Sequence, residues 1–388
     1  MSKAKSIPVP ARERLRFFEE RRERIVETIR ELVSVESPSD NKPALDSLAE
    51  ILAAKFEALG GRPTIHKQQS AGNHVQVDFG ATQHEKPVVL LGHYDTVYPI
   101  GTLTNMPCRI AQGKLWGPGA LDMKGGIALM LEALGALREW HGEVPRAVTV
   151  FLNSDEEVGS DSSRKLIEAL AKKSAAVLVL EPAAGLHGAL KTARKGVGGY
   201  HLRVIGHAAH AGLDFSKGAS AILELAHLIT EISKLSDLER GTTVNVGVIH
   251  GGTRTNVIAA EACAEIDVRI AHLEDGPQID TKLRALKPLN HRCKLEVSGG
   301  INRPPMERTA GVARLYEKAV ELAHELDWKT EEAAVGGGSD GNFTTAVGAA
   351  TLDGLGAVGE GAHATHESIV IEELPRRAAL LSLLIEHA

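Results

Sequence analysis

Three apolar stretches of the sequence each end on side chains that can bind a metal ion. The first ends at His93 and Asp95, the second runs into Glu156 and Glu157, and the third ends at Glu181. Converging carboxylates repel one another, and raising the pKa of every one of them is costly. A divalent cation removes the repulsion, and histidine with carboxylates suits Zn²⁺, which Mn²⁺ or Co²⁺ can replace. The pattern therefore predicts a metal site.

Two further segments carry side chains of the same kinds. Asp122 lies in the glycine-rich segment GPGALDMKGG, which opens an amphipathic helix, and His363 and His366 lie near the C-terminus in GAHATHE. Two metal ions about 3.5–4 Å apart are a recurrent arrangement in hydrolases. A second histidine would complete such a pair of sites, and by residue type either His363 or His366 can supply it.

The elements that must position these side chains follow from the apolar pattern. The three stretches are near-continuous rather than alternating, which is typical of strands buried on both faces of a mostly parallel sheet. They cover residues 87–91, 147–152 and 176–180. Helical spacing of apolar residues predicts helices over 12–35, 42–59, 125–140 and 162–173. Alternating strands and helices indicate an α/β domain, whose ligands bind beyond the carboxyl ends of the strands.

The pattern changes at about residue 191. Alternation of apolar and polar residues predicts half-exposed strands over 200–205, 242–249 and 262–270, with helices over 219–235 and 280–286. This pattern indicates an inserted α+β domain whose sheet is open on one face. The α/β pattern returns after Pro304-Pro305, with a helix over 311–326. We therefore expect a catalytic domain in two parts, residues 1–190 and 305–388, and an inserted domain over 191–304.

Composition narrows the class of protein. The chain has 388 residues, of which 43% are hydrophobic, and a net charge of −6 with both signs mixed, which argues against a nucleic-acid-binding surface. The N-terminus lacks the apolar segment of a secretory signal, and no run of about 18 apolar residues indicates a membrane span. Three cysteines lie far apart, which fits a reducing compartment. We expect a cytoplasmic protein.

Six motifs fall in an order and spacing that resemble a known family. They are HYDTVYP at 93–99, GPGALDMKGG at 117–126, NSDEEVGS at 153–160, EP at 181–182, GHAAHAG at 206–212 and HATHE at 363–367. Together they resemble the dinuclear zinc hydrolases that include aminoacylases, acetylornithine and succinyl-diaminopimelate deacylases, and glutamate carboxypeptidases. The resemblance extends from His93 to the PRR at 375–377. It implies an α/β metallohydrolase domain with helices on both faces of the sheet, and an inserted dimerisation or lid domain that forms a homodimer.

The resemblance also implies a ligand set for two Zn²⁺ ions per subunit. One ion would be bound by His93 and Glu181 and the other by Glu157 and His363, with Asp122 bridging both. The H-x-x-x-E spacing of the family selects His363 over His366. A cis peptide bond is implied after Asp122.

The remaining roles come from the same resemblance. Glu156 would be the general base, and Asp95 would hold the imidazole of His93 in its ligating tautomer, which makes physical sense for a residue behind a metal ligand. His210, rather than His207, would reach the site of a neighbouring subunit and stabilise the oxyanion. Asp155 is expected only to cap its turn.

Substrate contacts are predicted in the insert and in a glycine-rich turn. Arginine matches the two oxygens of a carboxylate, and Arg269, Asn256 and Arg303 resemble the contacts that bind a free carboxylate in the family. Gly337, in the GGGSD turn at 336–340, resembles a backbone contact to substrate. This turn lacks the Lys-Ser/Thr of a phosphate-binding loop. Together with Glu181-Pro182, it places the chain nearest to the glutamate carboxypeptidase branch.

The chain is therefore predicted to be a zinc-dependent hydrolase of an amide bond next to a free carboxylate. The expected reaction is release of a C-terminal amino acid such as glutamate from small peptides or N-acyl conjugates. The alternative is a deacylase of N-acyl amino acids or of N-succinyl or N-acetyl diamines. Loss of Glu156 or of two metal ligands would indicate a non-catalytic member of the family, and none of these residues is missing. A phosphoryl-transfer enzyme would need a phosphate-binding motif.

Overall fold

The computed structural model describes residues 9–80 and 86–388. The first eight residues, on which the expectation of no secretory signal partly rests, lie outside the described residues. The chain forms two compact units: unit 1 comprises Met1–Ala193, Arg308–Val335 and Ser339–Ala388, and unit 2 comprises Arg194–Glu307 and Gly336–Gly338. Their positions relative to one another are not determined. Within the described ranges, no helix combines the length and the apolar composition needed to cross a membrane.

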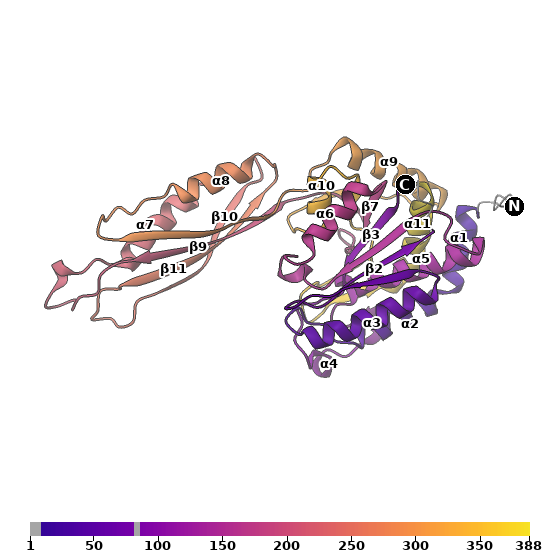
Figure 1. The fold of residues 1–388 in the computed structure, drawn as a ribbon, viewed down its shortest axis with the longest axis horizontal. Helices are drawn as coiled ribbons and strands as arrows, with labels where there is room; N and C mark the ends of the chain where they lie inside the picture. Colours follow the sequence, from indigo (N-terminus) through magenta and orange to yellow (C-terminus); the bar gives the residue numbers. More distant parts are fainter. Residues whose placement is uncertain (1–8, 81–85) are drawn as a thin grey trace. The chain divides into compact units, whose positions relative to one another are not determined.

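Unit 1 is built on a six-stranded sheet in the order β1-β2-β6-β3-β7-β14 (Figure 1). The strands β6, β3, β7 and β14 run parallel to one another, whereas β2 pairs antiparallel with β6 and β1 pairs antiparallel with β2. This confirms the predicted mostly parallel sheet. The strands are β1 (Arg62–His66), β2 (His74–Phe79), β3 (Val88–His93), β6 (Val148–Asn153), β7 (Ala176–Val179) and β14 (Thr351–Leu352).

Helices cover both faces of this sheet, as predicted. In β3, Val88 and Leu90 belong to the larger apolar core, whereas Val89 and Leu91 belong to a second one. The larger core contains side chains of α1 (Ala11–Glu20), α2 (Arg22–Val33), α3 (Lys42–Ala58), α5 (Gly125–His141), α9 (Ala310–Glu325) and α11 (Leu374–His387). The second core contains those of α6 (Arg164–Lys173) and α10 (Gly341–Ala346). Burial on both faces explains why the strands are continuously apolar.

The first predicted helix, over 12–35, is two helices in the structure. The chain bends at Arg21, between α1 and α2, where the backbone leaves helical geometry with φ −110° and ψ 15°. The two segments pack on different partners, because α1 lies against α11 and α2 lies against α5. Periodicity alone does not reveal such a break, since both segments bury the same kinds of residue.

A small four-stranded sheet of unit 1 holds the two remaining ligand-bearing segments. Its order is β15-β16-β5-β4, and Ser368 of β16 lies opposite Trp116 of β5. The segment that carries Asp122 follows β5, and the segment that carries His363 connects β15 to β16. The strands are β4 (Arg109–Ala111), β5 (Lys114–Trp116), β15 (Gly359–Glu360) and β16 (Ser368–Val370). Unit 1 also contains α4 (Thr102–Asn105), and β8 (Leu190–Arg194) pairs with β13 (Glu332–Val335).

Unit 2 is an α+β layer of the predicted kind. Its antiparallel sheet has the order β10-β11-β9-β12, and α7 and α8 lie on one face of it (Figure 1). The elements are β9 (Gly196–Ile205), α7 (Ala221–Ser233), β10 (Thr243–Gly251), β11 (Glu261–Ile270), α8 (Asp275–Arg284) and β12 (Lys294–Arg303). Helix α8 begins five residues before the predicted start, because Pro277 lies in its first turn, where a missing N–H costs no hydrogen bond.

Candidate metal centre

Two of the predicted ligands stand where parallel strands end. His93 is the last residue of β3, and Glu181 lies two residues beyond β7, whose Val179 is opposite Leu91. The ends of the two strands are therefore level. Nε2 of His93 lies 3.1 Å from Oδ1 of Asp122 and 3.4 Å from Oε1 of Glu181. One imidazole thus meets two carboxylates at the sheet edge.

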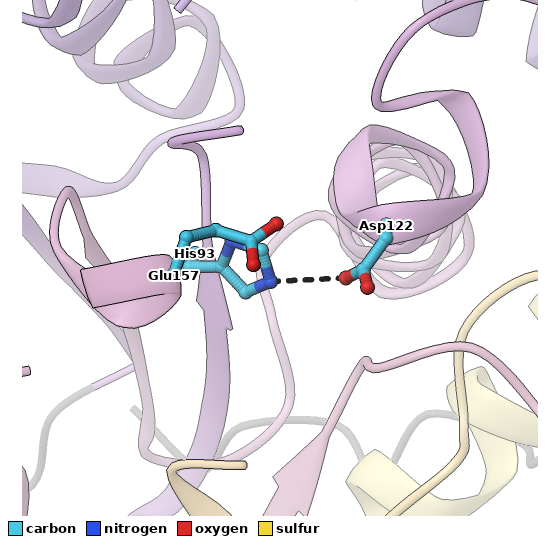
Figure 2. A group of neighbouring side chains, drawn as sticks. All are labelled: His93, Asp122 and Glu157. Carbon is cyan, nitrogen blue, oxygen red and sulfur yellow. Dashed lines mark hydrogen bonds and ion pairs between the residues drawn. The ribbon is translucent and has the colours of Figure 1, made fainter. Parts of the chain in front are cut away.

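Asp122 connects this group with a second one. Nε2 of His363 lies 3.1 Å from Oε2 of Glu157 and 3.5 Å from Oδ2 of Asp122. Ligand atoms of His93, Asp122 and Glu157 all lie within 4.8 Å of one another, and Figure 2 shows the three side chains converging from different elements. The two oxygens of Asp122 therefore face two different histidines, which is the arrangement of a bridging carboxylate.

The donor set fits two divalent metal ions. Oε1 of Glu157 is buried and finds no hydrogen-bond partner among the residues that the structure describes. A buried carboxylate oxygen without a partner is costly unless a cation or a donor meets it. Each half of the cluster offers one imidazole nitrogen and one carboxylate of its own and shares Asp122. These ligand types suit Zn²⁺ and related ions.

The electrostatics show how strongly the cluster attracts positive charge. Hydrogen bonds to Asp122 and Glu157 raise the pKa of His363 to about 10. Burial works against protonation of His93, but Asp122, Asp95 and Glu181 raise its pKa well above the ordinary value. Burial also opposes ionisation of Asp122, yet His363 and His93 hold its pKa well below the usual range. A site that favours protons on two imidazoles favours cations for the same reason.

Asp95 supports the ligands from behind. Nδ1 of His93 lies 3.1 Å from the backbone carbonyl oxygen of Asp95 and 3.4 Å from its carboxylate. The same carboxylate accepts the backbone N–H groups of Glu156 and Glu157, both at 3.2 Å, and the hydroxyl of Ser39 at 2.7 Å. Asp95 therefore contacts the imidazole and also holds the backbone of Glu156 and Glu157, which form an acidic turn beyond β6. The role predicted for Asp95 in holding the imidazole stays a prediction, and the contacts with the backbone of Glu156 and Glu157 were not part of it.

Asp155 does not cap its turn in the expected way, because it stands at the N-cap of the short helical turn Glu156–Val158 but its side chain makes no capping hydrogen bond there. Its buried carboxylate accepts the N–H of Ser162 at 2.8 Å and the hydroxyl of Ser163 at 2.6 Å. It thereby closes the chain on itself after Glu156 and Glu157. The turn that presents these two side chains is held at both ends, by Asp95 and by Asp155.

Comparison with known proteins identifies the family. Residues 89–387 match the sequence profile of Peptidase family M20/M25/M40. The chain belongs to this family. It is 30% identical to carboxypeptidase G2 of Pseudomonas sp. (strain RS-16) over 371 residues, which cover 93% of this chain and 88% of that protein. It is 29% identical to succinyl-diaminopimelate desuccinylase of Stenotrophomonas maltophilia (strain K279a), covering 77% of this chain and 83% of the relative.

Solved structures agree with the fold of this M20 chain. A tripeptidase of Staphylococcus aureus is 25% identical with a TM-score of 0.78, covering 94% of this chain and 98% of the other. The YXEP protein of Bacillus subtilis, described as a dinuclear metal-binding peptidase of the M20 family, has a TM-score of 0.69 at 15% identity, with 95% and 98% covered. The M20 chain is accordingly a metallopeptidase or amidohydrolase.

The geometry also distinguishes the two histidines near the C-terminus of the M20 chain. His363 meets Asp122 and Glu157, whereas the ring of His366 lies over Gly361, whose added Cβ would stand 2.9 Å from it. The H-x-x-x-E spacing pointed to His363, and His363 is the histidine that lies beside Asp122 and Glu157. The peptide bond between Asp122 and Met123 is cis, as the resemblance implied.

The remaining predicted residues belong to unit 2. Nδ1 of His210 accepts the backbone N–H groups of Gly212 and Leu213, both at 3.1 Å. The N–H of Ala211 donates to the carbonyl oxygen of Asn256 at 2.9 Å, so His210 and Asn256 lie on adjacent loops. Their distance from the ligands in unit 1 is not defined, and their roles stay predictions.

Three further predicted substrate contacts lie in unit 2, and two of them, Arg269 and Gly337, have hydrogen-bond partners there. Arg269, on β11, donates to the carboxylate of Asp267 from Nε and Nη2. Arg303 ends β12 and is buried. The carbonyl oxygen of Gly337 accepts Nη1 of Arg194 at 3.1 Å. Their roles as substrate contacts stay predictions.

Two buried carboxylates near the centre were missed as functional residues. Asp340 accepts the amide of Asn153 at 2.8 Å and the hydroxyl of Ser160 at 2.5 Å, behind the acidic turn. Glu367 accepts backbone N–H groups of the segment that carries Asp122. Both stand in motifs that the sequence displays, GGGSD and H-x-x-x-E. The GGGSD motif predicts a turn that contacts substrate, and the H-x-x-x-E motif selects His363 over His366, but neither prediction gives a role to its carboxylate.

Proposed function

We propose that the protein is a dinuclear zinc carboxypeptidase that releases a C-terminal amino acid, such as glutamate, from small peptides or N-acyl conjugates. The observation that carries the proposal is the position of Asp122, whose two oxygens face His93 and His363 separately. The 30% identity with carboxypeptidase G2 over nearly the whole chain supports this reaction. The second candidate is an N-acyl amino acid or diamine deacylase, which the 29% identity with the desuccinylase favours.

Five side chains would hold the two metal ions. His93 and Glu181 would bind one ion, Glu157 and His363 the other, and Asp122 both. When bound, the ions would polarise the scissile carbonyl group and lower the pKa of the attacking water. Zn²⁺ is the proposed ion, and Mn²⁺ or Co²⁺ are substitutes with the same ligand preferences.

Glu156 would move the proton. It would take a proton from the attacking water and return it to the leaving nitrogen, which is general base and then general acid catalysis. Its backbone N–H is held by Asp95, so its side chain is presented from a fixed turn next to Glu157. This neighbour is one of the proposed ligands, and the charge of Glu156 contributes to the raised pKa of His93, another proposed ligand.

His210 would donate a hydrogen bond to the oxyanion. Its Nδ1 accepts two backbone N–H groups, so in the neutral ring the proton would be on Nε2, which would then be the donor. A fixed donor stabilises the negative charge that develops on the carbonyl oxygen. Arg269, Asn256, Arg303 and Gly337 remain the proposed substrate contacts. Because Asp267 occupies Nε and Nη2 of Arg269, a substrate carboxylate would approach from Nη1 or displace Asp267.

A substrate panel tests the reaction class. Metal-loaded protein is incubated with dipeptides ending in glutamate, folate-type glutamates, N-acetyl amino acids and N-succinyl diamines, and the released products are quantified. We expect free glutamate from the first two groups. Activity confined to the acyl substrates would establish the deacylase alternative instead. Cleavage of none of them by protein that holds both metals would contradict both candidates.

We also propose a homodimer through one edge of unit 2. Strand β10 is an edge strand, and Ile249 on it and Leu223 on the neighbouring helix α7 are about 60% exposed (60% and 61%). An apolar groove of about 320 Å³ lies between this helix and the sheet, lined by Ile222, Leu225, Ala226, Ile229, Ile249, His250, Gly251 and Ala262. An apolar free edge invites pairing, and the same edge of a second copy would continue the sheet with two-fold symmetry.

Replacing Ile249 by lysine is expected to convert the dimer to a monomer, because a charge would be buried at the centre of the paired edges. Molar mass by light scattering measures the change. Leu273→Lys is the matched control, since Leu273 is also exposed but precedes α8, which packs on β12 at the opposite edge. A wild-type monomer, or an Ile249→Lys dimer, would contradict the proposed interface.

A cytoplasmic location is part of the same proposal. Within the described residues, Cys108, Cys263 and Cys293 are all free thiols. Unpaired cysteines are typical of reducing compartments. Recovery of the protein in the soluble fraction without disulfides would support the location, and recovery from an exported fraction would contradict it.

A further inference from the structure

Glu367 is a buried carboxylate that the proposed reaction does not use. Its side chain is fully inaccessible to solvent. Oε1 accepts the backbone N–H groups of Leu121 at 2.7 Å and of Asp122 at 2.9 Å, and Oε2 accepts that of Gly119 at 3.0 Å. Three N–H donors meet one acceptor-only group, an arrangement that an ionised carboxylate satisfies and that an amide or a hydroxyl cannot. The segment that carries Asp122 is therefore held in place by one side chain.

The same residue closes the segment that carries His363. The backbone N–H of Glu367 donates to the carbonyl oxygen of Ala364 at 3.0 Å, and its own carbonyl oxygen accepts the N–H of Gly117 at 3.3 Å. The hydroxyl of Tyr98 also donates to the carbonyl oxygen of Ala364, at 3.0 Å. Glu367 thus joins two segments that are remote in sequence, since Glu367 and Leu121 are separated by 246 positions.

The two segments carry Asp122 and His363, which must lie close together to bind the same metal ion. Nε2 of His363 lies 3.5 Å from Oδ2 of Asp122. Neither side chain reaches the other unless its backbone is correctly placed, and Glu367 is bonded to both backbones. Removing its carboxylate would let the segments move apart while leaving every proposed ligand in the chain.

We propose that Glu367 is a positioning residue that sets the affinity for the metal ion held by Glu157 and His363. The inference rests on the metal site of the proposed function. The effect must be unequal between the two ions. The Glu157–His363 site takes two ligands from the segments that Glu367 joins, whereas the His93–Glu181 site takes only Asp122 from them.

The test is a zinc titration of metal-free Glu367→Gln in competition with a chelating dye. Glutamine keeps the size of the side chain but turns an N–H₂ group toward the backbone donors. One zinc-binding step is expected to weaken by about 10–100-fold, the usual effect of losing a group behind a ligand, while the other step changes much less. In a His363→Ala background the same substitution should add little, because that background already lacks the affected site.

Glu224→Gln is the matched control. Glu224 is also buried, and its two oxygens accept the backbone N–H groups of Leu289 and Asn290 at 2.8 and 2.9 Å, but it belongs to unit 2. We expect it to leave both zinc-binding steps unchanged. A role of Glu367 in stability alone would make the two variants alike.

Two milder variants keep the proposal testable if Glu367→Gln does not fold. Glu367→Asp keeps the charge but shortens the reach, and Tyr98→Phe removes only the hydroxyl that holds Ala364. Both are expected to weaken the same step, with the smaller effect in Tyr98→Phe. Two unchanged steps in the Glu367 variants, or two steps weakened equally, would overturn the proposal. Because the titration uses zinc alone, an inactive wild-type protein that binds two zinc ions would contradict the proposed function without affecting this result.

Discussion

Replacing Glu156 by glutamine is expected to reduce kcat by about 10²–10⁴-fold, the usual contribution of a general acid–base group. Glutamine has nearly the size of glutamate but cannot take a proton from water or return one to the leaving nitrogen. Because Asp95 holds residue 156 through its backbone N–H, the turn is expected to keep its shape. The measurement is the rate of product release together with the metal content of the same sample.

The metal content separates loss of the base from loss of the site. Glu156→Gln is expected to retain both metal ions, because Glu156 is not among the proposed ligands. Glu168→Gln is the matched control, since Glu168 is a half-exposed glutamate on α6 that pairs with Arg164 and should leave kcat unchanged. A Glu156→Gln protein that keeps more than a small fraction of the wild-type rate would refute the assignment of the base.

Replacing His363 by alanine is expected to abolish one of the two metal-binding sites and nearly all of the activity. His363 contacts both Glu157 and Asp122, so its loss leaves one site with carboxylates alone. The remaining site, with His93 and Glu181, keeps its imidazole. Metal content by elemental analysis should fall from two equivalents per chain to one.

His366→Ala provides the control for this prediction. His366 lies three residues further on the same segment, its ring lies near Gly361, and the ion pairs with Asp122 and Glu157 are made by His363. It is expected to keep two metal equivalents. Loss of a metal ion in His366→Ala, with two retained in His363→Ala, would reverse the choice between the two histidines.

The sequence was sufficient to predict the sheet and the edge where the ligands gather. Continuous apolar stretches identify strands buried on both faces, and the carboxyl ends of parallel strands meet at one edge. His93 and Glu181 are predictable on that ground alone. Asp122 and His363 lie outside the large sheet; their residue types suggested a part in the site, but only the resemblance to a family selected His363 over His366 and implied the bridging role of Asp122.

The supporting contacts of Glu367 and Asp340, unlike the role of Asp95, could not be predicted from the sequence, for a physical reason. Glu367 acts on backbone N–H groups of Gly119, Leu121 and Asp122, which have no side-chain pattern that a sequence can display. Asp340 likewise meets Asn153 and Ser160 only because the chain returns from a distant position. The periodicity of apolar residues predicts which side chains face the core, whereas these contacts depend on which remote segments of the chain come together in the fold.

The most direct test of the account is the number of metal equivalents at which activity reaches its maximum. Metal-free protein is titrated with zinc while bound metal and glutamate release from a dipeptide are followed in parallel. The dinuclear site predicts that two equivalents bind per chain and that the rate reaches its plateau at the second. Full activity with one equivalent, or in metal-free protein, would contradict it.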